Sequence, residues 1–350
     1  MKRRAFLQKS AIAAGGVLCG STLAGCGNQG KEQGMTKPAG QVMTVAGPIP
    51  PETLGVTLPH EHVLVDFIGA DKVSRDRYDA DEAFEVILPH LKQIRDLGCQ
   101  AFVECTPAYI GRDAALVKRL SEASGLKMLT NTGYYGAAND KFVPAHAYEE
   151  TADDLAARWA REWEEGIEDT GIRPGFIKTG VDKGSLSEID RKLVTAAARA
   201  HLKTGLTIAS HTGYGVPAHE QLGVLREEGV AGNAWIWVHA QNETDNDLHE
   251  QAAEQGAWLS FDGIHTKSLE THLNHAVEMK RRGLLDRMML SHDAGWYRPG
   301  ESGGGKFRPF DLLFVTFLPA LQVAGFTQAE IRQVTVENPA RAFTVGVRGI

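Results

Sequence analysis

Six side chains that can bind a metal ion stand at or just after the ends of short apolar runs: His60, His62, Lys178, His211, His239 and Asp293. His60 and His62 are two residues apart, so on a strand their side chains project to the same side and could share one ion. Histidine and carboxylate ligands gathered from separate segments suit a borderline cation such as zinc. Each signal alone also fits a structural role, because a buried histidine or a lysine with an apolar stem needs no ion.

Short apolar runs separated by helical patterns are the elements that would position these side chains. Helices are expected at Glu82–Leu97, Thr151–Glu168 and Asp190–Lys203, the last ending at Gly205. Near-continuous apolar strands between helices are typical of a parallel sheet buried on both faces. We therefore predict an α/β fold, a (β/α)8 TIM barrel with its functional groups at the carboxyl ends of the strands. The alternative of an open doubly wound sheet is disfavoured, because no Gly-x-Gly-x-x-Gly turn follows the first run. The predicted strands are Leu54–Thr57, Ala101–Cys105, Lys127–Asn131, Gly175–Lys178, Leu206–Ser210, Ala234–His239, Ala257–Phe261 and Arg287–Ser291.

The composition narrows the class of protein. The 350 residues carry 37 Lys and Arg against 44 Asp and Glu, a formal net charge of −7. Such an acidic balance argues against a nucleic-acid partner, whose phosphates require clustered basic side chains. A hydrophobic content of 43% with 23% charged residues fits an ordinary globular chain. Beyond the N-terminus, no apolar run approaches the roughly 18 residues that a membrane span needs.

The N-terminus has the pattern of an export signal. Arg3 and Arg4 form a twin-arginine start, and the weakly apolar stretch Ala11–Gly20 follows. Leu23-Ala24-Gly25-Cys26 resembles a bacterial lipobox, in which cleavage leaves Cys26 as the lipidated first residue. We expect a signal peptide at 1–25, a flexible tether at 26–43 and the catalytic domain at 44–350. The protein would then be exported by the twin-arginine route to the periplasm or cell surface, touching the membrane only through its lipid. The alternative is a short hydrophobic N-terminal helix.

From about Thr44 to Phe343 the sequence resembles the phosphotriesterase-like branch of the amidohydrolase superfamily. The resemblance covers nearly the whole expected mature chain, and its motifs are highly specific in combination. They are Thr53-Leu54-Gly55-Val56-Thr57-Leu58-Pro59-His60-Glu61-His62, Ile110-Gly111-Arg112-Asp113, the segment Gly166–Lys178, Ser210-His211-Thr212, Ser291-His292-Asp293 and Thr335-Val336-Glu337-Asn338-Pro339-Ala340-Arg341.

The resemblance implies a centre of two divalent metal ions, with zinc the expected metal. One ion would be held by His60, His62 and Asp293, and the other by His211 and His239. Lys178, carboxylated on its amine to N6-carboxylysine, would bridge both ions together with a hydroxide. Such a modification is chemically coherent, since burial near cations depresses a lysine pKa and leaves a neutral amine that can react with carbon dioxide. Asp293 would accept the proton as general base.

Other residues depart from the family pattern or match it less closely. Tyr135 matches best the tyrosine that lactonase relatives place beside the leaving oxygen, although packing of the pocket wall would equally explain it. The family's proton relay uses an Asp and a His; Glu243 is the candidate for the first, whereas Gly263 stands where the second would be. His292 should point away from the site by strand alternation. Trp296 and the glycine-rich segment 300–306 differ from the best-studied members, which weakens inference about the substrate.

The sequence therefore predicts an exported, metal-dependent hydrolase that cleaves an ester, namely a lactone, a carboxylic ester or a phosphotriester. An amidase acting on an N-acyl amino acid is the nearest alternative, because the same metal centre would serve it. A non-catalytic binding lipoprotein on the same barrel is the alternative from another class; the complete ligand set argues against it. The substrate is a small molecule, and a homodimer is one open alternative for the oligomeric state.

Overall fold

The computed structural model of the protein describes residues 40–350. The predicted signal peptide, Cys26 and most of the predicted tether lie outside these residues. Val42 and Met43, which we assigned to the tether, instead belong to a short hairpin of β1 (Val42–Thr44) and β2 (Gly47–Ile49). Val42 is fully buried, and the amide of Val45 donates to the carbonyl of Met128 at 2.9 Å. The domain therefore begins before residue 44, because the hairpin packs as part of it.

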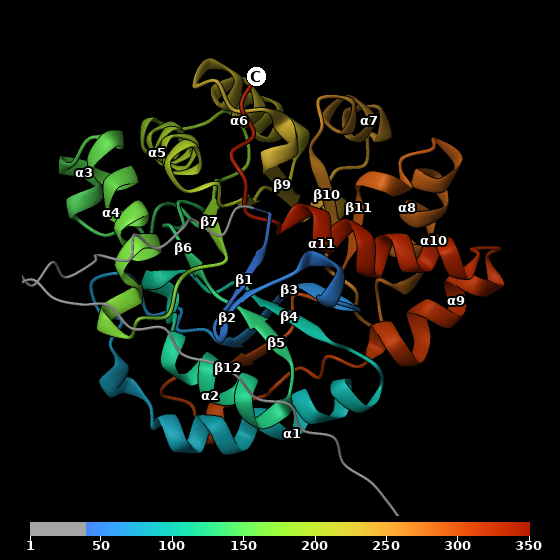
Figure 1. Cartoon of the computed structure of the whole chain (residues 1–350), viewed down its shortest axis with the longest axis horizontal. Coiled ribbons are helices and arrows are strands. Elements are labelled where there is room, and N and C mark those ends of the chain that lie inside the picture. Colours follow the sequence, from blue (N-terminus) through green and yellow to red (C-terminus); the bar gives the residue numbers. More distant parts are fainter. Residues whose placement is uncertain (1–39) are drawn as a thin grey trace, which may run out of the picture. The chain divides into compact units, whose positions relative to one another are not determined.

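Parallel strands form the centre of the domain, and helices surround them (Figure 1). One sheet has the order β11-β10-β9-β8-β7-β6 and a second has the order β12-β3-β4-β5. The strands are β3 (Thr57–Leu64), β4 (Ala101–Glu104), β5 (Lys127–Leu129), β6 (Asn131–Thr132), β7 (Phe176–Gly180), β8 (Ile208–His211), β9 (Trp235–Val238), β10 (Trp258–Phe261), β11 (Met288–Leu290) and β12 (Gly295–Tyr297).

The two sheets are continuous at one edge and are in contact near the other. Only Thr130 separates β5 from β6, so these two strands act as one strand that belongs to both sheets. At the other edge, just after β11, the amide of Asp293 donates to the carbonyl of His60 in β3 at 3.2 Å. The order of strands around this centre is that of a (β/α)8 barrel, which confirms the predicted fold class.

Side chains alternate between an inner and an outer core along these strands. Ala101, Val103, Ala209 and Ile236 belong to a cluster in which the strands contact one another inside the barrel. Their neighbours, such as Phe102, pack in a second and larger cluster against the helices. This arrangement leaves the carboxyl ends of the inward-facing rows as the place where polar side chains meet.

The helices cover the outer face of the strands (Figure 1). Six of the eleven helices within residues 40–350 begin at a residue whose side chain accepts from an amide of the first turn. Thr151 forms a capping box with Asp154, and Gly205 ends the following helix in the left-handed conformation, as predicted. Thr151–Glu168 was predicted too long, because the helix stops before Gly166. The helices are α1 (Ala80–Asp96), α2 (Ala114–Ser124), α3 (His146–Glu149), α4 (Ala152–Glu165), α5 (Glu188–Thr204), α6 (Gly215–Glu227), α7 (Asn246–Glu254), α8 (Leu269–Arg281), α9 (Leu318–Val323), α10 (Gln328–Arg332) and α11 (Asn338–Ala342).

The first predicted strand, Leu54–Thr57, is wrong in its position. Strand β3 begins at Thr57 and runs through the two histidines to Leu64. Polar residues that face the site interrupt the apolar pattern, so the pattern ends before the strand does. Pro59 is accommodated because the pairing of β3 with β4 shifts register between Leu58 and Glu61. Among residues 40–350, none of the helices is both long and apolar enough to cross a membrane.

Candidate metal centre

A cavity of about 130 Å³ opens at the carboxyl ends of the strands. All six predicted metal ligands line it, together with Tyr135 and Trp296. Val65, Phe67 and Ile110 supply apolar wall beside them. The full lining is His60, His62, Val65, Phe67, Cys105, Pro107, Ile110, Tyr135, Lys178, His211, His239, Asp293 and Trp296.

Three of these residues hold their ligand atoms close enough to share one ion. The Nε2 atoms of His60 and His62 lie 3.2 Å apart, and Nε2 of His62 lies 3.1 Å from Oδ1 of Asp293. Nε2 of His60 lies 3.9 Å from the same carboxylate oxygen. Two nitrogen ligands at about 2.05 Å from a tetrahedral zinc ion are separated by about 3.3 Å. The donor set of two imidazoles and a carboxylate therefore fits a metal ion.

Hydrogen bonds to the other ring nitrogen orient these histidines. Nδ1 of His62 lies 2.8 Å from Oγ1 of Thr106, and that hydroxyl donates its own proton to the carbonyl of Leu64 at 2.9 Å. The hydroxyl must then accept a proton from His62, which places the ring proton on Nδ1 and leaves Nε2 as the ligand atom. Sequence reasoning did not identify Thr106, which no strand-end pattern distinguishes from an ordinary polar residue.

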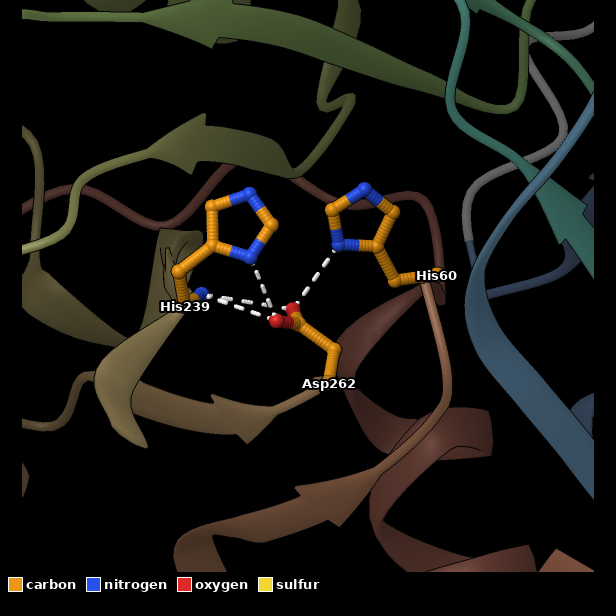
Figure 2. A group of neighbouring side chains, drawn as sticks. All are labelled: His60, His239 and Asp262. Carbon is orange, nitrogen blue, oxygen red and sulfur yellow. Dashed lines mark hydrogen bonds and ion pairs between the residues drawn. The ribbon is translucent and has the colours of Figure 1, made fainter. Parts of the chain in front are cut away.

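Asp262 joins histidines from both predicted ion sites, as Figure 2 shows. Its carboxylate accepts from Nδ1 of His60 at 2.8 Å and from Nδ1 of His239 at 2.6 Å, and also from the His239 amide at 3.1 Å. These are hydrogen-bond lengths, so Asp262 supports the ligand rings from behind. Burial opposes its charge, but attraction to His239 and His60 outweighs burial and lowers the Asp262 pKa well below its usual range.

Asp262 is not among the residues predicted from the sequence, although the sequence contains a signal for it. Asp262 directly follows the seventh predicted strand, and barrel enzymes place their functional groups at this end of the strands. Asp262 also changes the basicity of the His239 ring. Burial lowers the His239 pKa, yet the charge of Asp262 and its hydrogen bond raise the pKa above its usual value. A more basic imidazole is a stronger metal ligand.

His239 reaches the cavity only because its backbone is unusual. Ile236 and Val238 face the inner core, whereas Trp235 and Trp237 pack in the outer core, so continued alternation would turn His239 outward. Its φ of 66° lies in the left-handed region, which breaks the alternation. The ring then lies 5.0 Å from that of His60, between centroids. Such a conformation costs a non-glycine residue about 1–3 kcal/mol and is typical of functional sites.

The remaining predicted ligands, His211 and Lys178, come from β8 and β7. The His211 ring centroid lies 4.3 Å from that of His239. Lys178 is 2% exposed, and burial lowers the pKa of its ammonium even though nearby anionic groups oppose the shift. Its Nζ donates to the carbonyl of Thr179 at 3.2 Å. Within residues 40–350, His211 does not join the tight groups of histidine and carboxylate ligand atoms around His60.

The two tyrosines after β6 have different surroundings. Tyr135 lines the cavity, with its ring centroid 5.0 Å from that of His211 and 5.5 Å from Nζ of Lys178. Tyr134 points elsewhere, since its hydroxyl lies 3.0 Å from Nε2 of His146 and its ring packs against Trp159. Among the described residues that line the cavity, Tyr135 has the only hydroxyl group.

The candidate relay positions lie away from the cavity lining. The Glu243 carboxylate accepts from the amides of Gly215, Thr244 and Asp245, which ties down its own loop. A Cβ at Gly263 would approach Nε2 of Gln241 to 2.7 Å, so a larger residue there would require that flexible side chain to move. His292 points away from the cavity, as expected: its Nδ1 lies 2.7 Å from the buried carboxylate of Glu61.

A larger cavity of about 460 Å³ lies on the other side of the loops that follow β3 and β4. Several charged side chains at this cavity pair with one another or with nearby residues. Arg112 is buried and pairs with Glu162 at 2.7 Å, and Arg75 pairs with Asp113 at 2.7 Å. Its described lining contains no histidine. The chemistry therefore belongs to the smaller cavity, where the ligand atoms converge.

Comparison with known proteins agrees with this geometry. A model of the phosphotriesterase family matches residues 40–343. The phosphotriesterase homology protein of Escherichia coli is 30% identical over 293 residues, which cover 83% of this chain and 98% of that protein. Its crystal structure with phosphate in the active site has a TM-score of 0.73 at 29% identity, over 83% of this chain and 99% of that one.

Two further relatives have different names. The aryldialkylphosphatase of Saccharolobus solfataricus is 26% identical, over 83% of this chain and 95% of that protein. The N-acetyltaurine hydrolase of Xenopus tropicalis is 25% identical, over 89% of this chain and 99% of that protein. The match over nearly the whole domain confirms the resemblance drawn from the sequence motifs, and the chain belongs to the phosphotriesterase family of hydrolases.

Proposed function

We propose that this protein is a binuclear zinc hydrolase that cleaves an ester: a lactone, a carboxylic ester or a phosphotriester. One observation supports this proposal above the others. His60, His62 and His239 each direct Nδ1 to a buried oxygen acceptor, so their Nε2 atoms are the ones left to face one cavity. Rings held in this way are typical of metal ligands whose orientation is set by a surrounding layer of partners.

In the proposed centre, His60, His62 and Asp293 would hold one ion, and His211 and His239 would hold the other. Bound ions supply Lewis acidity, which polarises the scissile bond and lowers the pKa of water. Asp293 would accept the proton from the attacking water, since its carboxylate lines the cavity.

Lys178 is proposed to carry a carboxyl group and to bridge the two ions. Its nitrogen attacks carbon dioxide, forms a carbamate and releases a proton, which requires the neutral amine. The support for this step is the burial of Lys178, which lowers its pKa. A bare ammonium among cation ligands would be repelled by the ions, whereas a carbamate is an anion that offsets part of their charge.

Amide hydrolysis is the second candidate function. A relative with 25% identity is named N-acetyltaurine hydrolase, so the same scaffold serves an amide in that protein. An amide differs from an ester chiefly in the leaving nitrogen, which must receive a proton. Tyr135 offers a hydroxyl in the cavity for either leaving group.

The function is tested by metal analysis and a substrate panel. We expect about two zinc ions per chain after zinc-supplemented expression, and turnover of lactones, aryl esters or phosphotriesters. A higher kcat/KM for N-acyl amino acids or N-acetyltaurine would select the amidase. Bound metal without turnover of any ester or amide would favour the non-catalytic binding protein, and fewer than one ion per chain would refute the binuclear centre.

Export through the twin-arginine route and lipidation of Cys26 are also part of the proposal. They are supported by the order of signals in the first 26 residues. Replacing Arg3 and Arg4 with Lys should leave the precursor in the cytoplasm, whereas Cys26→Ala should release the protein from the membrane. Export that persists without the arginine pair would instead indicate the general secretion route.

A further inference from the structure

Glu61 lies between two of the candidate ligands, but its side chain faces the opposite side of β3. It is 0% exposed, and its carboxylate accepts four hydrogen bonds. Oε1 accepts from Oγ of Ser291 at 2.8 Å and from the amide and Nδ1 of His292 at 2.9 and 2.7 Å. Oε2 accepts from the amide of Ala294 at 2.8 Å. All four donors belong to the segment that carries Asp293.

His292 extends this contact to the C-terminal helices. The amide of Leu313 donates to Nε2 of His292 at 2.9 Å, so Nε2 carries no proton. The single ring proton is then on Nδ1 and is donated to Glu61. The imidazole is 1% exposed and connects the carboxylate to the segment that leads into α9. Glu61 is therefore held by the Asp293 segment, and His292 anchors that segment to the residues that lead into α9.

Asp293 itself has a strained backbone. Its φ of 54° lies in the left-handed region, which residues other than glycine rarely adopt. Its amide donates to the carbonyl of His60 at 3.2 Å, and its carbonyl accepts from Arg308 at 2.7 Å. The residues on either side of it, His292 and Ala294, both donate their amides to Glu61. The strain is sustained because hydrogen bonds hold the segment before, at and after Asp293.

We propose that Glu61 is a positioning residue for Asp293. By binding the amides on both sides of Asp293, it keeps the left-handed backbone and directs the carboxylate toward His62. The His60-Glu61-His62 segment would then supply two ligands from one face of the strand and the support for the third from the other. This inference rests on the proposed metal centre and adds a role for a residue on the far side of the barrel wall.

The geometry indicates what an amide at this position would do. In Glu61→Gln, the amide oxygen can keep the three donors now bound by Oε1. Its NH2 group then faces the amide of Ala294, and two donors cannot bond to each other. The variant should lose the contact that follows Asp293 while retaining those that precede it. Asp113→Asn is the matched control, because Asp113 is also a buried carboxylate that accepts several hydrogen bonds. Its three donors belong to Leu116, Arg75 and Tyr78, and it caps α2 instead.

The experiment has one arm without metal and one with it. In the metal-free protein, hydrogen exchange of the amides in residues 291–295 should be faster in Glu61→Gln than in wild type or Asp113→Asn. With zinc, chelator competition should show about 10- to 100-fold weaker binding of one ion in Glu61→Gln. In the Asp293→Ala background, Glu61→Gln should cause no additional loss of affinity, because its effect acts through Asp293.

Each outcome decides the inference separately from the proposed function. Unchanged exchange in residues 291–295 would overturn the positioning role whether or not the protein binds metal. Faster exchange with unchanged zinc affinity, or a loss of affinity that persists in Asp293→Ala, would show that Glu61 is merely structural. A wild-type protein that takes up no zinc would refute the metal centre, and the exchange arm would then decide whether Glu61 holds the segment.

Discussion

Asp262 is the residue whose replacement tests most sharply how the candidate centre is held together. Its Oδ2 accepts from His60 and, at 3.3 Å, from the amide of His239. Its Oδ1 has three donors: the ring and the amide of His239 and, at 3.3 Å, the side-chain amide of Gln241. In Asp262→Asn only one of the two atoms remains an acceptor. Because three donors surround the Oδ1 position, the amide oxygen should occupy it and the NH2 group should face His60.

The expected consequence is unequal weakening of the two ion sites. With its Nδ1 proton facing a donor, His60 must rotate or move the proton to Nε2, and either change removes it as a ligand in its present geometry. Loss of a partner of this kind lowers metal affinity about 10- to 100-fold, or about 1.4 to 2.7 kcal/mol. The ion assigned to His60, His62 and Asp293 should therefore weaken most. The His239 site should weaken less, since it keeps its hydrogen bond but loses the negative charge.

The assay is chelator competition on metal-free protein, with both dissociation constants for zinc fitted and compared with wild type. Asp113→Asn serves as the control for replacing a buried carboxylate, and it should leave both constants unchanged. Two constants within about twofold of wild type in Asp262→Asn would refute the reasoning. Equal weakening of both sites would show instead that the charge, and not the orientation of His60, is what Asp262 contributes.

Three further predictions follow from the same geometry. Lys178→Ala should abolish turnover and weaken metal binding. Added acetate or propionate should restore part of the rate, because a carboxylate can occupy the vacated bridging position. A Lys178→Met variant that keeps both metals and the full rate would contradict the bridging role. Tyr135→Phe should leave metal content unchanged and lower kcat about 100-fold or more if the hydroxyl donates a proton to the leaving group, whereas an unchanged kcat would assign the ring to wall packing. Burial lowers the pKa of both His249 and His272 to about 4, so the unfolded chain binds more protons than the folded chain between about pH 6.5 and 4. Each histidine should therefore lower the free energy of unfolding by about 2 kcal/mol on going from pH 7 to pH 5. Urea unfolding of the metal-free protein should show a smaller decrease between these pH values in His249→Gln than in wild type. An identical decrease in the two proteins would contradict this.

The sequence by itself determined the barrel and the row of residues at its carboxyl edge. Seven of the eight predicted strands overlap strands of the structure at nearly the same positions, because a strand buried on both faces must be apolar along its length. His60 and His62 could be placed on one side by alternation alone. The only misplaced predicted strand is the one that carries these histidines, because the polar residues of β3 that form the site interrupt the apolar pattern.

The tertiary structure alone decided how these residues are held. Hydrogen bonds join His60 to Asp262 and Glu61 to His292 across 202 and 231 residues of sequence, a separation over which local patterns carry no information. The left-handed backbones of His239 and Asp293 likewise have no local cause, because neither residue is glycine. Both conformations persist only where contacts from distant strands outweigh their strain. Alternation along a strand can identify a candidate ligand, but the orientation of that ligand depends on hydrogen bonds between distant strands, which form only in the folded barrel.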